Sequence, residues 1–220
     1  LPSTLMMNAI PAMIAGVKNI VLANPRLSGR INPAVMYVAK KCKIKKIISV
    51  GGAQAIGSLA YIQKVDKIFG PGNDFVARAK REVFGDVGIE GMIAGPSEIT
   101  VVADKLLDMS KVITSMIAQS EHGINSQSIL ITKNEKLIKN INKKINVYLK
   151  KIPRKNIVIQ SLKKNGLLIL AKNNQQIVNI INMISPEHLE LLSKDYKKLL
   201  INICNVGSIG LGIYSPVAAS

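Results

Sequence analysis

Short apolar runs rich in β-branched residues alternate along this chain with segments of about ten residues whose apolar positions recur at helical spacing. The first half predicts helices over 4–17, 34–42, 53–62 and 74–83, and short strands over 20–22, 46–50 and 67–69. The second half predicts strands over 99–102, 128–132, 167–170 and 207–210, a short run at 189–192, and helices over 107–121, 135–149 and 174–184. This alternation is typical of βαβ units, so we expect an α/β protein with mainly parallel sheets.

A glycine-rich connector over 85–97 interrupts the alternation and separates two series of elements. We therefore predict two Rossmann-like lobes, 1–95 and 96–220. No G-x-G-x-x-G follows a predicted strand, so both lobes are interpreted as an incomplete dinucleotide-binding type. The Lys-rich segment 133–164 is interpreted as a solvated outer helix and loop.

The composition predicts an aliphatic core, because 48% of the residues are hydrophobic and only 4% are aromatic. No uninterrupted apolar run of about 18 residues is present, so no membrane span is expected. Cys42 and Cys204 lie far apart, which favours a reducing cytoplasm over a disulfide framework. Residues 1–5 contain neither Met nor a basic segment, so we expect no signal peptide here and a true N-terminus further upstream.

The formal net charge of +17 raises the possibility of a nucleic-acid-binding module. Lys, Asn and Ile rise together in stretches such as 139–144, which instead indicates basic residues on solvated faces. Aromatic residues that could stack on bases are not interleaved with the basic ones. We favour the solvated faces and expect no nucleic acid, and we keep the basic α/β binding module as the alternative.

Two glycine turns in the first lobe follow predicted strands. Gly51-Gly52-Ala53-Gln54 comes after 46–50, and Gly70-Pro71-Gly72-Asn73 comes after 67–69. Ligands of open parallel sheets bind beyond the carboxyl ends of strands, where glycine allows close approach of the backbone and a helix N-terminus favours anions. Gln54 and Asn73 are therefore candidate binding residues, although turns and helix caps alone would give the same pattern.

Three further motifs belong to the second lobe. Gln119 and His122 share one face at the end of a helix, where an imidazole and an amide oxygen could bind a metal. Glu187 and His188 stand side by side before a strand and could share acid–base work. Ser97 follows the connector and could contact a substrate. We expect the histidine motifs to line one cleft at the carboxyl edge of the sheet, while capping and surface roles remain the alternative.

Six stretches, in order and over nearly the whole chain, together resemble the histidinol dehydrogenase family. They are LPST at 1–4, VGGAQAI at 50–56, VDKIFGPGN at 65–73, AGPSE at 94–98, QSEHG at 119–123 and SPEHL at 185–189. The resemblance implies a cytoplasmic, homodimeric enzyme of histidine biosynthesis that oxidises L-histidinol through the aldehyde to L-histidine, with NAD and zinc as cofactors.

The resemblance also implies a role for each candidate residue. Gln54 and Asn73 would contact NAD, which assigns the cofactor to the first lobe. Ser97 would contact the substrate. Gln119 and His122 would be zinc ligands that also touch the substrate. His188 would be the general base of the hydride-transfer steps, and Glu187 would activate the water that adds to the aldehyde, both in contact with the substrate.

The chain departs from the family pattern at its ends. The Gly-Asp-Tyr motif that holds a zinc Asp would begin at Ser220, and a later zinc His, a substrate Glu and an upstream nicotinamide-site Tyr have no counterpart. Ser120 inside the zinc motif and an apparent extra residue at 90–91 are smaller differences. We expect an internal fragment that is inactive in isolation. A non-catalytic scaffold is the remaining alternative.

Overall fold

The computed structural model describes residues 2–90, 96–105, 108–150 and 152–215. The chain divides into two compact units, Leu1–Ala94 and Gly95–Ser220. Residues 94–95 of the AGPSE motif, the extra residue at Gly91 and the start of the helix expected from residue 107 lie outside the described residues. No helix among those described is long and apolar enough to cross a membrane.

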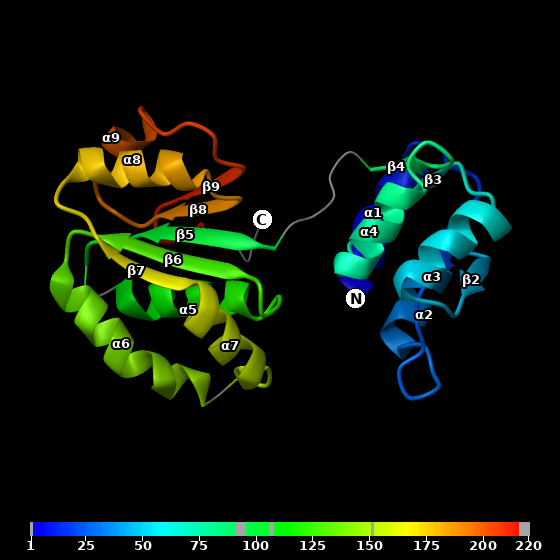
Figure 1. The fold of residues 1–220 in the computed structure, drawn as a ribbon, viewed down its shortest axis with the longest axis horizontal. Helices are drawn as coiled ribbons and strands as arrows, with labels where there is room; N and C mark the ends of the chain where they lie inside the picture. Colours follow the sequence, from blue (N-terminus) through cyan, green and yellow to red (C-terminus); the bar gives the residue numbers. More distant parts are fainter. Residues whose placement is uncertain (1, 91–95, 106–107, 151, 216–220) are drawn as a thin grey trace. The chain divides into compact units, whose positions relative to one another are not determined.

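The first unit is built from short helices and strands (Figure 1). They are α1 (Pro2–Ile14), β1 (Val21–Ala23), α2 (Pro33–Lys41), β2 (Lys46–Ile48), α3 (Gly52–Gly57), the π-helical η1 (Ser58–Ile62), β3 (Lys67–Ile68), α4 (Asp74–Glu82) and β4 (Gly88–Ile89). β1 pairs with β2 and β3 pairs with β4, both in parallel.

Two apolar clusters hold the first unit. Leu5 and Ala9 of α1 pack with Val35 and Ala39 of α2 against β1 and β2. The second cluster joins α3, η1, α4, β3 and β4 and includes Ile68 of β3, which is 3% exposed.

The helix expected over 53–62 is an α-helix that continues as a π-helix. The interpretation of 85–97 as a plain connector missed β4.

The second unit is a five-stranded parallel sheet with helices on both faces. Its elements are β5 (Glu98–Val102), α5 (Met109–Ser120), β6 (Gln127–Thr132), α6 (Glu135–Leu149), α7 (Lys155–Asn165), β7 (Gly166–Leu170), α8 (Asn174–Ile184), β8 (His188–Leu191), α9 (Tyr196–Leu200) and β9 (Ser208–Leu211). The strand order is β7-β6-β5-β8-β9, and every pairing is parallel. This is a doubly wound order that reverses between β5 and β8, so the α/β class with parallel strands is confirmed.

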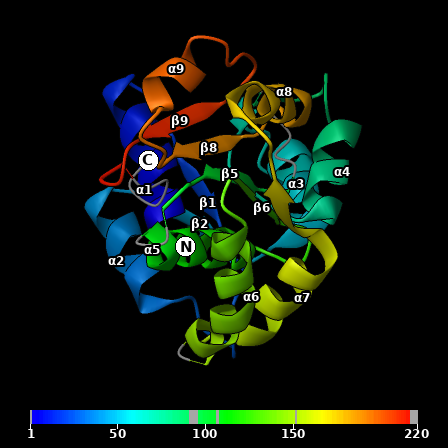
Figure 2. The same ribbon diagram turned by 90° about the vertical axis from the view of Figure 1, so that its left-hand side faces the viewer.

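Alternate residues of the central strands face the two layers of helices. Ile99 and Val101 of β5 pack with α5, α6 and α7, whereas Val102 packs with Leu189 of β8 on the side of α8 and α9. Figures 1 and 2 show these two layers on either side of the sheet. The loop expected before residue 164 is wrong, because α7 is a helix whose Val158 is fully buried.

Candidate functional site

The five candidate residues of the second unit gather at one edge of its sheet, and it is the amino edge. His188 is the first residue of β8, and it stands level with Ile99 of β5 and with Ser208, the first residue of β9. Glu187 directly precedes β8, and Ser97 directly precedes β5. The carbonyl of Ser97 accepts a hydrogen bond from the N–H of Gln127, the first residue of β6, at 3.0 Å.

Gln119 and His122 reach this same edge from the helix layer. α5 follows β5 and covers its face, so it runs back towards the amino ends of the strands and finishes at Ser120, just before β6 begins at Gln127. The expectation of a site at the carboxyl edge is therefore wrong. The site lies at the amino edge because a crossover helix runs antiparallel to the strands that it connects, which brings the residues at its C-terminus back to the amino ends of the strands.

The last turn of α5 is fixed by buried hydroxyl groups. The Oγ atoms of Ser120 and Ser128 lie 3.0 Å apart, and Ser128 Oγ donates to the carbonyl oxygen of Met116 at 3.0 Å. This ties the helix end to β6 and sets the position of Gln119. The unusual serine of the QSEHG motif thus has a structural role of its own.

Gln119 is 4% exposed, and its Nε2 atom is buried with no hydrogen-bond partner among the residues that the structure describes. His122 is exposed and follows the helix in a turn, with its N–H donating to the carbonyl oxygen of Gln119 at 3.2 Å. Across the described ranges, no group of three or more His, Cys, Asp or Glu side chains could hold a metal ion. The amide oxygen of Gln119 and a ring nitrogen of His122 are two donors of the type that zinc accepts.

Glu187 and His188 are held by both neighbouring strands. Glu187 Oε2 accepts from the N–H of Glu98 on β5 at 3.1 Å, and the Nδ1 atom of His188 lies 2.8 Å from the Oγ atom of Ser208 on β9. Between the two residues, Glu187 Oε1 lies 3.7 Å from His188 Nε2. The imidazole side chain is 23% exposed and the carboxylate 51%, so both acid–base groups can reach solvent.

The opposite, carboxyl edge of this sheet is occupied by polar groups that pair with one another. Ser193 Oγ donates to Asp104 Oδ2 at 2.6 Å, and Lys133 Nζ donates to Asn174 Oδ1 at 2.6 Å. The same ammonium lies 3.7 Å from Asp195 Oδ2 and 4.0 Å from Asp104 Oδ2. These residues follow β5, β6, β7 and β8 at the edge where the fold would ordinarily bind a ligand, close to the strand reversal.

The two candidates of the first unit lie beyond the carboxyl ends of their strands, as expected. Gln54 is exposed in the first turn of α3, behind Gly52 at a φ of +67° that favours glycine. Asn73 is the N-cap of α4, and its Oδ1 accepts from the N–H of Val76 at 3.1 Å. The capping role foreseen for Asn73 is therefore present. The approach of Gln54 and Asn73 to each other stays a prediction.

A half-buried ion pair supports the turn before Asn73, and no motif in the sequence predicted it. Lys80 on α4 is 4% exposed and pairs with Glu90. Its Nζ also donates to the carbonyl oxygen of Gly70 at 2.5 Å, while Glu90 Oε2 accepts from the N–H of Gly70 at 3.3 Å. The N–H and the carbonyl oxygen of Gly70 are thus both bonded to this ion pair, and the φ of Gly70 is +121°.

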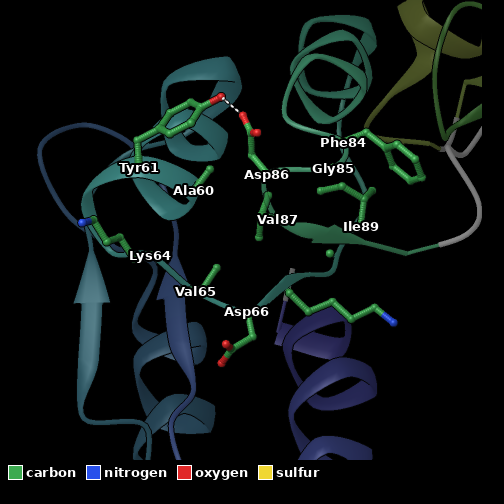
Figure 3. A pocket seen from close by; sticks show the side chains of 12 residues that line it. Ala60, Tyr61, Lys64, Val65, Asp66, Phe84, Gly85, Asp86, Val87 and Ile89 are labelled. Carbon is green, nitrogen blue, oxygen red and sulfur yellow. Dashed lines mark hydrogen bonds between the residues drawn. The ribbon is translucent and has the colours of Figure 1, made fainter.

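A broad hollow of about 810 Å³ lies at the opposite, amino ends of β3 and β4 (Figure 3). Tyr61 reaches across it and donates to Asp86 Oδ2 at 2.7 Å. This hydrogen bond raises the pKa of Tyr61 above its usual value. The exposed ring of Phe84 and the side chains of Lys64 and Asp66 also line the hollow, which is therefore partly apolar and partly charged. None of these residues was a candidate from the sequence.

Comparison with known proteins gives one consistent result. The family model described as histidinol dehydrogenase matches residues 1–220. A histidinol dehydrogenase of Pelagibacter ubique is 53% identical over 99% of this chain and 52% of its own length, and one of Listeria monocytogenes is 45% identical over 97% and 51%. The crystal structure of histidinol dehydrogenase from Elizabethkingia anophelis superimposes with a TM-score of 0.89 at 38% identity, over 99% of this chain and 51% of that one. The chain spans about half the length of the relatives it matches.

Proposed function

Because this chain belongs to the histidinol dehydrogenase family, we propose that it supplies the central part of an enzyme that oxidises L-histidinol through the aldehyde to L-histidine with NAD. The single observation that carries the proposal is the gathering of Ser97, Gln119, His122, Glu187 and His188 at one edge of one sheet. These residues come from positions up to about ninety apart in the sequence, and the fold brings them together.

Glu187 and His188 provide the proton transfers. We assign to His188 the acceptance, at Nε2, of the proton that leaves the substrate hydroxyl during hydride transfer. The second step needs a water molecule to add to the aldehyde, and the exposed carboxylate of Glu187 takes the proton of that water. Both groups reach solvent, which a general base must do to return its proton.

Ser97, Gln119 and His122 hold the substrate at this edge. Gln119 and His122 also fit a zinc site in part, because an imidazole and the oxygen of an amide side chain are possible zinc ligands. When bound, zinc would act as a template that holds the imidazole and amino nitrogens of the substrate. Structural and catalytic zinc sites need more than two protein ligands, so further ligands have to come from elsewhere in the enzyme.

Gln54 and Asn73 bind NAD, which accepts the hydride when bound. This assignment to NAD is supported by the position of both residues beyond the carboxyl ends of strands, at helix N-termini rich in glycine. We further propose that the enzyme works in the cytoplasm as a homodimer. Sedimentation of the enzyme at several concentrations tests the dimer.

The test uses what we call the extended enzyme, in which these 220 residues replace the matching segment of the Pelagibacter ubique relative. Formation of NADH with histidinol is followed in the parent and in His188→Gln. Loss of a general base should lower kcat by about 10² to 10⁴. Lys172→Gln, an exposed residue beyond β7 at the opposite edge, is the control and should keep the parent rate. A parent that binds histidinol and NAD without turnover would contradict the proposed activity.

The 220 residues without that extension are the second arm of the test. Because two proposed zinc donors are fewer than a zinc site needs, we expect poor retention of zinc and negligible turnover of histidinol. Stoichiometric zinc that survives dialysis of these residues alone would contradict this expectation.

A further inference from the structure

We propose that Ser208 is a positioning residue for His188: its hydroxyl accepts the Nδ1–H of the imidazole and so keeps Nε2 as the atom that takes up a proton. The effect on catalysis rests on the function proposed above, whereas the effect on the imidazole does not. Ser208 carries no role in the motifs that identify the family, and it lies 20 residues from His188 in the sequence.

The register of the sheet brings the two side chains together. His188 and Ser208 are direct partners in the parallel pair β8–β9, so their side chains leave the sheet on the same face. That face is the one covered by α5, because His188 also stands level with Ile99, which packs against α5. Ser208 Oγ lies 2.8 Å from Nδ1, an ordinary hydrogen-bond length.

The backbone of β9 gives the serine a fixed place. The N–H of Ser208 donates to the carbonyl oxygen of Glu187 at 2.9 Å, and the N–H of Gly207 donates to that of Pro186 at 3.2 Å. A Cβ atom on Gly207 would lie 2.6 Å from the carbonyl oxygen of Glu187, so only glycine permits this close approach. The strand that carries the hydroxyl is therefore tied directly to the Glu187-His188 segment that it orients.

The hydrogen bond to Ser208 decides which ring nitrogen is free. Nδ1 faces the serine, whereas Nε2 lies 3.7 Å from Glu187 Oε1, beyond hydrogen-bond length. A neutral histidine that takes a proton at Nε2 must carry its own proton on Nδ1. Ser208 Oγ then accepts this Nδ1–H before the transfer and continues to accept it from the imidazolium formed afterwards. No proton passes to the serine.

Ser208→Val and Ser208→Thr in the extended enzyme form a matched pair, because the two side chains have the same shape and only threonine has a hydroxyl. We expect kcat for histidinol to fall about tenfold in Ser208→Val, with KM changed less than about twofold, and to recover in Ser208→Thr. A loss of packing alone would affect both variants equally. Equal kcat in both variants and the parent would overturn the role in catalysis.

The second readout is the tautomer of His188, measured by ¹⁵N NMR of the extended enzyme labelled at histidine, with His188→Gln to assign the signal. We expect the Nδ1–H form in the parent and in Ser208→Thr, and a shift towards Nε2–H in Ser208→Val. The same tautomer in all three proteins would overturn the proposal. This readout needs no turnover, so an inactive parent with the expected shift would refute the proposed function and still support the positioning role.

Discussion

Replacing Lys80 by methionine removes the cation that holds the backbone of Gly70 in the first unit. The Lys80 side chain is 5% exposed, and its ammonium serves two acceptors, the Glu90 carboxylate and the carbonyl oxygen of Gly70. Methionine has nearly the same length and no charge. The substitution therefore tests the ion pair with little change in packing volume.

Two effects set the size of the loss. A hydrogen bond from a charged donor contributes about 1.5–3 kcal/mol, and the bond to Gly70 disappears. Glu90 is left as a carboxylate without its cation, which costs about 3–5 kcal/mol for a fully buried pair. Because the Glu90 side chain is 26% exposed, water compensates part of this second cost. We expect the free energy of unfolding to fall by about 3 kcal/mol in Lys80→Met.

Denaturation of the extended enzyme in urea measures this loss, and the same helix offers a matched control. Arg78 and Glu82 form an ion pair one turn apart whose side chains are 74% and 61% exposed, so Arg78→Met should cost no more than about 0.5 kcal/mol. The double variant Lys80→Met with Glu90→Met leaves no unpaired charge and should recover part of the loss. If Lys80→Met costs no more than Arg78→Met, the ion pair does not stabilise the turn and the reasoning is refuted.

Two further predictions concern the first unit. Gln54→Ala in the extended enzyme should weaken NAD binding, measured by titration calorimetry, and leave the zinc content unchanged; equal loss of both would mean that the residue supports the fold. Asp86→Asn should lower the pKa of Tyr61 towards its ordinary value, which absorbance titration of tyrosinate can measure against Tyr61→Phe. Because the pKa of Tyr61 is raised in the folded state, the stability that this hydrogen bond contributes is present below the unfolded-state pKa and is lost as pH rises through the folded-state pKa. An unchanged tyrosinate titration in Asp86→Asn would contradict the assignment of the raised pKa to Asp86.

Local signals explain which elements the sequence could predict. α6 and α8 have the predicted bounds, because Asn134 and Asn173 cap them through side chains that accept from Leu137 N and Gln176 N. α7 lacks this signal. The residue before it is Arg154, whose side chain makes no capping hydrogen bond, and the helix passes directly into β7 at Gly166.

Contacts that depend on tertiary structure could not be predicted. Lys80 lies on a helix with a strongly polar sequence, so its burial depends on Glu90 and on the close approach of the Gly70 turn. The bond between Ser208 and His188 depends on the register of β8 against β9. The chain positions of Gln119, His122, Glu187 and His188 led us to expect one site at the carboxyl edge of the sheet, and the return of α5 to the amino ends of the strands makes that edge wrong.

Both edges of the second sheet hold a buried polar atom without a partner among the described residues, and they differ in their other polar groups. At the carboxyl edge, Asp104, Lys133 and Ser193 use one another as partners, so a ligand there would have to break protein hydrogen bonds before it formed its own. At the amino edge, Gln119 Nε2 is buried without a partner in the part of the chain that the structure describes, and Nε2 of His188 lies beyond hydrogen-bond length of its neighbouring carboxylate. A buried polar atom without a partner carries a cost that a bound ligand can remove. Asp108 Oδ2, just before α5 at the carboxyl edge, is such an atom too, so the unpartnered atoms alone do not separate the two edges. The neighbouring Glu187 and His188, which both reach solvent, favour the amino edge as the binding edge of this unit, although the strand order alone would favour the other.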